Sequence, residues 1–412
     1  MTGTAASRDA LDAIIRYNRR FVGDGRDPAW LRTKLDRLCA SPFGFLRGTF
    51  HLFVADWQRA GDDPLAAAAD QPIVGDLHLE NFGAFRAADG SVVFDVNDFD
   101  ETASGSPALD LARLATSIVL ADEKHGDARA VERIGACLDG WCTAARSLDL
   151  RPIAPKEAPP LVRALLDTAE DASRGAWLQR RVEGDAGARR FKSNDKYLRV
   201  TDATERAAIE AAVRAFAATC AERPPEVPDW PHVLDIAVRI AGTGSLGRFR
   251  WAILAQGKSD KPGKERILEL KEAVPSSLDP TCTSAAQAAR VIDTQRRLQG
   301  APPAFLGVAD VGGRACTVRE LQPTEAKLDA AALKAGDLDA LARACGTVLG
   351  RLHRRAGADL PARFAGREAA LARRVAAHAL RQAAQVHDDW AALVAARKPV
   401  EAALFAPASG AG

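Results

Sequence analysis

The chain carries its most informative stretch at Val74-Gly75-Asp76-Leu77-His78-Leu79-Glu80-Asn81, and Asp98-Phe99-Asp100 begins 17 residues after Asn81. Phosphoryl transfer from a nucleotide requires a carboxylate near the attacking hydroxyl and oxygen ligands that hold Mg²⁺ against the phosphates. This stretch contains both kinds of group on either side of a short predicted hairpin. We therefore predict that Asp76 is the catalytic base. The predicted Mg²⁺ ligands are Asn81, Asp98 and Asp100.

An acidic loop of this kind also has plainer interpretations. Aspartates are common in solvated turns, and the alternative roles for those around Phe99 are caps or a loose Ca²⁺ site. An EF-hand is excluded because Phe99 occupies a required ligand position and no glycine follows it. We expect His78 to order the loop by hydrogen bonding and not to bind metal.

A glycine-rich turn, Gly242-Thr243-Gly244-Ser245-Leu246-Gly247, matches the pattern G-x-G-x-x-G. In a dinucleotide-binding fold this turn opens a helix, whereas the flanking residues here, 235–240 and 248–254, alternate as strands do. We therefore expect the turn to join two strands and to cover phosphates, with a tight hairpin that binds no ligand as the alternative. The residues expected to contact the nucleotide are Gly242, Gly244, Ser245 and Gly247.

A third strand is predicted over residues 266–271, and Lys271 ends it. Kinases carry the lysine that contacts the α- and β-phosphates on their third strand, which follows the glycine turn. We therefore predict that Lys271 binds the nucleotide and takes part in catalysis, although a lone strand lysine is more often a solvated edge residue. Its acidic partner stays open among Asp293, Gln295 and Glu272.

The order of these segments is the reverse of that in ordinary kinases, because the acidic stretch precedes the glycine turn by about 170 residues. Packing depends on contacts and not on chain order, and termini often lie at the surface, so a permuted chain is physically acceptable. We predict an α+β, two-lobed, protein-kinase-like fold that is circularly permuted. It would combine a small antiparallel-sheet lobe with a larger, mainly helical lobe.

Pattern changes along the chain predict its division into domains. Helical spacing dominates residues 1–222, which we expect to form the large lobe with the catalytic and metal-binding loops. A proline-rich linker at 223–228 leads to a small β-rich nucleotide-binding lobe over 229–325. Helices over 326–405 return to the large lobe, and the tail 406–412 is expected to be disordered.

The Gly-Asp-Leu-His version of the acidic loop resembles that of aminoglycoside phosphotransferases and choline kinases. This resemblance extends to Gly105, Pro107 and Asp110, and it implies that Asp110 braces the catalytic loop. Over about residues 15–360 the chain also resembles the bacterial family called domain of unknown function 2252, which is regarded as kinase-like and has no settled substrate. The segments that carry this second resemblance are Ser41-Pro42-Phe43, Arg47-Gly48, Gly75-Asp76 through Gly83, Arg290-Val291 and Gln295-Arg296.

Composition excludes several classes of protein. The 412 residues are 47% hydrophobic and 27% charged, so the chain is neither wholly disordered nor collagen-like. Lys and Arg total 56 against 54 for Asp and Glu, and this balance gives no reason to expect a nucleic-acid partner. With no signal-peptide pattern and no long apolar run, we expect a cytoplasmic protein without a membrane partner. Seven scattered cysteines argue against a disulfide framework.

Taken together, these patterns predict an ATP- and Mg²⁺-dependent phosphotransferase that acts on an unidentified hydroxyl-bearing small molecule or protein. Two alternatives stay open: a nucleotide-binding pseudokinase or scaffold without turnover, and adenylyl transfer from the same cleft. Arg47, Arg296 and Arg319 are candidates for binding an anionic acceptor, although structural ion pairing is the commoner role for arginine. The sequence does not identify the acceptor or the oligomeric state.

Overall fold

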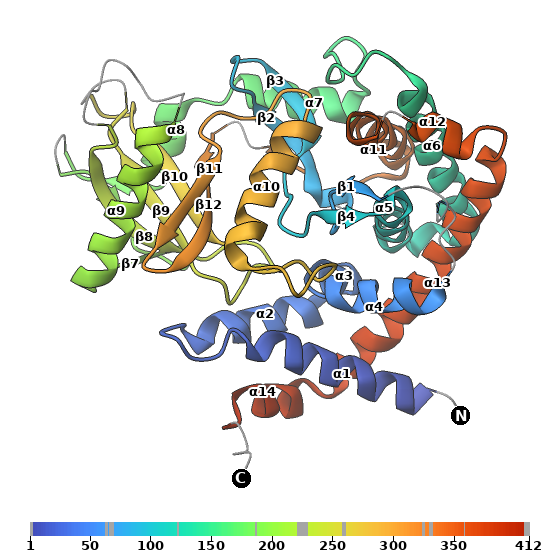
Figure 1. The fold of residues 1–412 in the computed structure, drawn as a ribbon, viewed down its shortest axis with the longest axis horizontal. Helices are drawn as coiled ribbons and strands as arrows, with labels where there is room; N and C mark the ends of the chain where they lie inside the picture. The colour runs from blue at the N-terminus through green and yellow to red at the C-terminus, as the bar shows by residue number, and fades with distance from the viewer. Residues whose placement is uncertain are drawn as a thin grey trace.

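The computed structural model shows a mixed fold of helices and short antiparallel sheets (Figure 1). The residues that it describes are 3–61, 65, 70–121, 123–185, 188–220, 230–257, 261–323, 326–328, 333–357 and 359–407. The linker predicted at 223–228, and the predicted tail from residue 408 onward, lie outside the described residues.

Helices from the two ends of the chain pack together along one side of the molecule, where both termini lie (Figure 1). The N-terminal helices are α1 (Gly3–Arg19), α2 (Pro28–Ala40), α3 (Pro42–Gly48) and α4 (Phe50–Ala60). The C-terminal helices in this layer are α13 (Glu368–Ala395) and α14 (Arg397–Phe405), whereas α12 (Leu360–Phe364) contacts α6 (Asp127–Arg146). Both α1 and α2 contact α13 and α14, so the first and last parts of the chain form one layer.

The acidic stretch lies among short strands in the middle of the molecule. These elements are β1 (Gln71–Ile73), the 3-10 helix η1 (Leu79–Asn81), β2 (Phe82–Arg86), β3 (Val92–Val96) and β4 (Ala103–Gly105). β1 pairs with β4, and β2 pairs with both β3 and β13 (Ala326–Lys327). The hairpin of β2 and β3 therefore brings η1, which precedes β2, and the residues after β3 to the same end.

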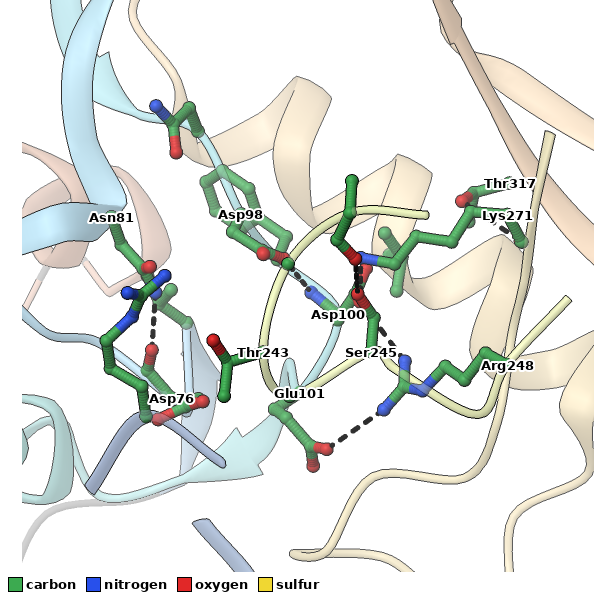
Figure 2. Close-up of a pocket in the computed structure, with 18 of the residues that line it drawn as sticks. Asp76, Asn81, Asp98, Asp100, Glu101, Thr243, Ser245, Arg248, Lys271 and Thr317 are labelled. Atoms are coloured by element: carbon green, nitrogen blue, oxygen red, sulfur yellow. Dashed lines mark hydrogen bonds and ion pairs between the residues drawn. The ribbon is translucent and has the colours of Figure 1, made fainter. Parts of the chain in front are cut away.

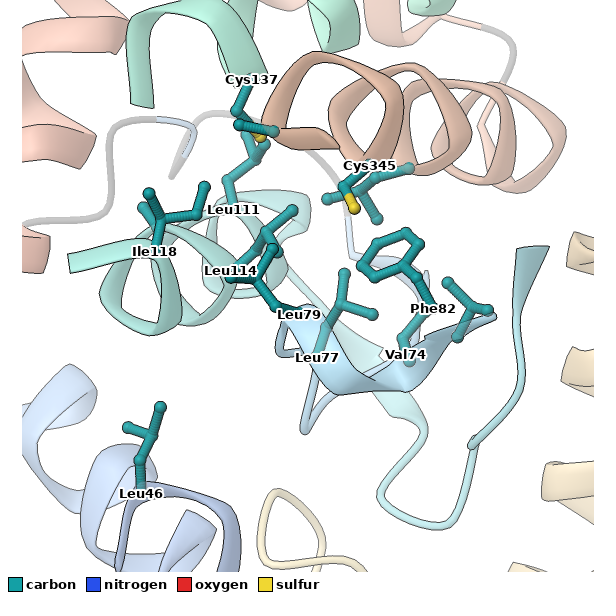
Figure 3. Packing of buried hydrophobic residues seen from close by; sticks show 14 of the residues in the cluster. Leu46, Val74, Leu77, Leu79, Phe82, Leu111, Leu114, Ile118, Cys137 and Cys345 are labelled. Carbon is teal, nitrogen blue, oxygen red and sulfur yellow. The ribbon is translucent and has the colours of Figure 1, made fainter. Parts of the chain in front are cut away.

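A helical core supports this segment from behind. Its helices are α5 (Pro107–Ala121), η2 (Glu123–His125), α6 (Asp127–Arg146), α7 (Pro160–Glu170) and α11 (Ala335–Ala356). Figure 3 shows apolar side chains of the acidic stretch, among them Val74, Leu77 and Leu79, beside residues of α5, α6 and α11. All three are at most 1% exposed, so they fix the loop while its polar neighbours remain available to the cavity.

Helices α6 and α11 approach each other closely because small residues lie between them. A Cβ atom at Gly346 of α11 would overlap the carbonyl group of Cys137 on α6. One face of α11 is buried, since Leu341, Cys345 and Leu352 are fully inaccessible to solvent. This packing sets the position of His353, which follows on the same helix.

The largest sheet is antiparallel, in the order β11-β12-β10-β9-β8-β7. Its strands are β7 (Tyr197–Arg199), β8 (Val233–Arg239), β9 (Arg250–Ala255), β10 (Arg266–Glu272), β11 (Gly307–Val311) and β12 (Arg314–Leu321). Helix α9 (Ala203–Thr219) packs on one side through an apolar cluster, and α10 (Ser284–Leu298) lies between the sheet and the acidic segment (Figure 1). The three strands predicted around the glycine turn are all present, as β8, β9 and β10.

The helical run predicted up to residue 222 is interrupted in the structure. Besides α8 (Arg174–Gln179) it contains β5 (Val182–Glu183), β6 (Arg190–Phe191) and β7, and β7 extends the large sheet. Strands of two or three residues are too short to show a period-two pattern, and they form because a neighbouring strand offers hydrogen bonds. β7 therefore belongs structurally to the large sheet, and β5 and β6 pair with each other.

Two further expectations concern the whole chain. None of the helices in the described ranges combines the length and the apolar character needed to cross a bilayer. All seven cysteines are free, as the scattered pattern predicts, and Cys137 and Cys142 are buried in the helical core.

Candidate functional site

A cavity of about 170 Å³ lies between the large sheet, α10 and the acidic segment. Figure 2 shows Asp76 and Asn81 on one side of it and Lys271 on the other, with Asp98 and Asp100 between them. The structure therefore brings together two segments that are distant in sequence. The predicted site residues that line the cavity are Asp76, Asn81, Asp98, Asp100, Gly242, Gly244, Ser245 and Lys271.

The Lys271 ammonium group forms an ion pair with the carboxylate of Asp100. Burial lowers the pKa of Lys271, and the nearby carboxylates of Asp100 and Asp98 act in the opposite direction. Asp100 also accepts a hydrogen bond from Arg248 Nη1 at 3.1 Å. Asp100, which the sequence predicted to bind metal together with Asp98, is therefore held by two cations of the protein.

The acidic partner of Lys271 is not one of the three residues left open by the sequence. Glu272 pairs with Arg26 and accepts a hydrogen bond from the Phe249 backbone N–H at 2.8 Å. Asp293 is exposed on α10, and Gln295 lines the cavity but donates to Gln299 at 3.1 Å. The partner is Asp100 itself, which the sequence assigned only to metal.

Asp98 is held as a carboxylate by its surroundings. Burial acts to raise its pKa, but the positive charge of Lys271, the Asp100 backbone N–H and nearby arginines outweigh it and lower the pKa to about 2. The Oδ1 atom of Asp98 accepts this N–H at 3.2 Å. An ionised carboxylate at the cavity wall is the group that a divalent cation prefers.

Asn81 supplies a second oxygen on the same side. Its Nδ2 atom donates to the Asp76 backbone carbonyl, which orients the side chain and leaves Oδ1 as an acceptor. Within the described parts of the chain, no cluster of three Asp, Glu, His or Cys side chains forms a metal cage. Mg²⁺ often uses one or two carboxylates together with substrate phosphates and water, so Asp98 and Asn81 fit its requirements.

Asp76 is bound by a buried arginine. Its Oδ1 atom accepts hydrogen bonds from Arg113 Nε at 2.9 Å and Nη2 at 2.7 Å. Burial raises the pKa of Asp76 to about 6, because the opposing charge of Arg113 only partly offsets desolvation. A carboxylate with a pKa in this range is suited to accept a proton near neutral pH.

Arg113 was not predicted from the sequence. It is the only charged residue after Asp110 in the buried helix α5, and its side chain is fully inaccessible. A single guanidinium in an otherwise apolar buried helix needs a carboxylate partner, and this is the signal that could have identified it.

Asp110 braces the loop before Asp76, as the resemblance to small-molecule kinases implies. Its two carboxylate oxygens accept the backbone N–H groups of Val74 and Gly75, each at 2.8 Å. His353 Nε2 lies 3.0 Å from Asp110 Oδ2, and His353 Nδ1 accepts the Trp141 indole N–H at 3.0 Å. Because an indole only donates, His353 carries its proton on Nε2 and donates it to Asp110.

Gly75 is required at this bend. Its φ is +93°, and a Cβ atom there would overlap the backbone carbonyl of Glu101. Glu101 in turn accepts the Ser277 backbone N–H at 2.7 Å and lies 3.4 Å from Arg248. The turn before Asp76 and the segment after Asp98 are thus fixed against each other.

The glycine turn is attached to α2 by two cations. Arg37 donates to the Gly242 carbonyl, and Lys34 Nζ donates to the Gly244 carbonyl at 3.1 Å. Since the C=O and N–H of a trans peptide point in opposite directions, the N–H groups of Thr243 and Ser245 are turned away from α2. Within the described residues, neither N–H group donates to a backbone acceptor.

Gly247 lies outside the cavity. It has a φ of +99°, and a Cβ atom there would be 2.9 Å from Leu31 Cδ2 of α2. Its carbonyl accepts Arg26 Nε at 2.9 Å. The last glycine of the motif therefore serves packing against the N-terminal helices, while the first two face the cavity.

Lys34 is a second residue that the sequence did not identify. It is 1% exposed on α2, and burial, together with the charges of Arg248 and Arg20, lowers its pKa to about 7. The neighbouring Tyr17 lines the cavity and stacks on His51 with ring centroids 4.0 Å apart. Only the docking of α1 and α2 brings these residues to the site.

The three candidate acceptor-binding arginines all have partners within the protein. Arg47 pairs with Glu80 at 2.6 Å, and Arg319 pairs with Glu269 at 2.9 Å. Arg296 donates to a backbone carbonyl at 2.6 Å. Each of the three arginines is therefore held by a partner within the protein. Arg47 and Arg319 also line the cavity.

Comparison with known proteins places the chain in a family. The model of the family described as an uncharacterized protein conserved in bacteria, DUF2252, matches residues 26–396. The chain therefore belongs to this family. Searches of curated proteins and of solved structures give no match.

Proposed function

We propose that this member of the DUF2252 family is a cytoplasmic ATP- and Mg²⁺-dependent phosphotransferase that acts on a hydroxyl-bearing small molecule or protein. The observation that carries the proposal is the ion pair of Lys271 with Asp100, two residues beyond Asp98. A lysine that binds phosphates and a carboxylate that binds Mg²⁺ must face each other across one crevice for phosphoryl transfer.

We further propose that the fold is a circularly permuted kinase-like fold. The glycine turn joins β8 to β9, Lys271 lies on β10, and α10 precedes the next two strands. A kinase-like small lobe carries its glycine loop, lysine and first helix in this order. The acidic segment and α5, which would form the large lobe, precede the sheet in this chain.

The residues would divide the work as follows. Asp98 and Asn81 would hold Mg²⁺, which would supply positive charge to neutralise the transferred phosphoryl group. Lys271 would exchange Asp100 for phosphate oxygens. The Asp76 carboxylate, held by Arg113, would accept the proton of the attacking hydroxyl on its Oδ2 atom.

The test is ATP consumption by Asp98→Asn in the presence of Mg²⁺ and a library of hydroxyl compounds. Because even outer-shell changes at metal sites cost 10- to 100-fold, we expect loss of a direct ligand to lower the rate at least about a hundredfold. Asp293→Asn, on the exposed face of α10, is the matched control and should leave the rate unchanged. Full activity of Asp98→Asn would refute the assignment.

A scaffold that binds nucleotide without turnover is the second candidate. It is favoured by the two hydrogen bonds that Arg113 donates to Asp76 Oδ1, because they occupy one oxygen of the proposed base. Mg²⁺-dependent stabilisation by ATP without any ATP consumption would support it.

Adenylyl transfer is a further alternative, because the same cleft would transfer an adenylyl group if ATP were bound in the inverted direction. Where turnover occurs, the mass of the product separates an added phosphoryl group from an added adenylyl group.

A further inference from the structure

The sheet side of the cavity is lined by cations. Arg239 of β8, Arg250 of β9, Lys271 of β10 and Arg319 of β12 all line it. The strand register places Arg250 opposite Lys271 and Arg319 opposite Glu269. Side chains opposite one another, and those two residues apart on one strand, share a face of the sheet. Four adjacent strands therefore direct positive charge toward one surface of the cavity.

One buried carboxylate holds the three arginines together. Glu269 is fully inaccessible, and it lies 2.8 Å from Arg250 Nε and 2.9 Å from Arg319 Nε. Arg239 forms an ion pair with the same carboxylate. Arg239 and Arg319 make further interactions besides these, and both line the cavity. The three arginines line the cavity, whereas Glu269 is not among its lining residues.

This wall suits a polyanion better than an uncharged aromatic base. A base can stack on a guanidinium group, but it leaves the positive charge of the cluster unneutralised. Phosphate oxygens, in contrast, accept charge-assisted and bidentate hydrogen bonds from guanidinium groups. The chemistry of the wall therefore matches a polyanion.

We propose that Arg239, Arg250 and Arg319 form a polyphosphate subsite that continues from Lys271 along the sheet. The proposal rests on the proposed function, since it names the part of the donor that this site recognises. The donor is then selected by its phosphate chain and not by its base. Inorganic triphosphate with Mg²⁺ should occupy the same site.

The test measures binding by calorimetry with Mg²⁺ present, using ATP, inorganic triphosphate and adenosine as probes. We expect triphosphate to bind within about tenfold of ATP, and adenosine to show no measurable binding. Arg319→Gln and Arg239→Gln should each weaken triphosphate binding about ten- to a hundredfold, the range expected for one charge-assisted hydrogen bond. Both variants also need an unfolding midpoint near that of the wild type.

Arg266→Gln is the matched control, because Arg266 lies on β10 but pairs with Glu320 at 2.7 Å and does not line the cavity. It should leave triphosphate affinity within about twofold, as expected for a partner outside the site. Should Arg239→Gln and Arg319→Gln both keep full affinity for triphosphate, the subsite is refuted and the cluster is purely structural.

The outcomes separate this inference from the proposed function. If ATP binds and triphosphate does not, or if adenosine binds as tightly as ATP, the subsite is wrong and the phosphotransferase proposal stands. If triphosphate binds as expected but no turnover is found, the subsite stands and the phosphotransferase proposal fails. If none of the probes binds, both are overturned.

Discussion

The two walls of the cavity are built in different ways. The acidic wall comes from one continuous segment, residues 74–101, whose apolar side chains are buried in the helical core. The cationic wall is assembled from four strands and from a turn held by α2. A wall made by one segment depends on local bracing, whereas the assembled wall depends on the docking of separate elements. The two walls should therefore respond differently to substitution.

The largest effect is expected on the acidic wall, at Asp76. Asp76→Asn removes the proposed proton acceptor while keeping the side-chain shape. We expect kcat to fall about 10²- to 10⁴-fold, the usual contribution of general base catalysis. Nucleotide affinity measured by calorimetry should stay nearly unchanged. Asp89→Asn, in the exposed turn between β2 and β3, is the control, and equal losses in both variants would contradict the role of Asp76.

Bracing of the same wall is tested at Asp110. Asp110→Ala leaves the N–H groups of Val74 and Gly75 and the His353 ring without their carboxylate. Removing one member of a buried charged network costs about 3 to 5 kcal/mol, so urea unfolding should show a loss of this size. A loss below about 1 kcal/mol, the range of a surface change, would mean that the network does not hold the loop.

A pH profile of kcat/KM examines the Asp76 carboxylate in the intact protein. Burial raises the pKa of Asp76 to about 6, and only its ionised form accepts a proton. Activity should therefore fall about tenfold for each pH unit below 6 and level off above it. The residual kcat/KM of Asp76→Asn should not show this fall below pH 6. A profile that stays flat down to pH 4.5 would contradict the assignment.

The smallest effect is expected where α2 supports the glycine turn. Lys34→Met replaces a buried cation by an apolar side chain of similar length and removes its bond to Gly244. We expect ATP affinity to fall about three- to tenfold, since one hydrogen bond to the turn is lost. Arg32→Met, at a more exposed position of the same helix, is the control.

Lys34 should also make the free energy of unfolding depend on pH. Burial lowers the pKa of Lys34 to about 7, so the unfolded chain binds more protons than the folded chain between pH 7 and its ordinary value of 10.5. The free energy of unfolding should rise with pH in this window, and Lys34→Met should remove that rise. An unchanged slope in the variant would show that Lys34 is not the group responsible.

The difference between the walls also explains what the sequence could predict. Asp76, Asn81 and Asp98 lie within one short segment, so their spacing along the chain is informative by itself. The strands on both sides of the glycine turn followed from their period-two alternation. Asp110 was found through its match to a known kinase pattern.

Other parts of the site could not be predicted in this way. Tyr17 reaches the cavity, and Lys34 reaches the glycine turn, only because α1 and α2 dock there, and local spacing carries no information about such docking. The pairing of Asp100 with Lys271 depends on how two distant segments meet. β7 was missed because three residues show no period and its pairing comes from β8.

The central claim is that a Mg²⁺-nucleotide binds in the crevice between the two walls. A crystal structure with Mg²⁺ and a non-hydrolysable ATP analogue tests it most directly. The account predicts Mg²⁺ at about 2.1 Å from an Asp98 oxygen, with Lys271 contacting phosphate in place of Asp100. An analogue bound outside this crevice, with the ion pair of Lys271 and Asp100 intact, would contradict it.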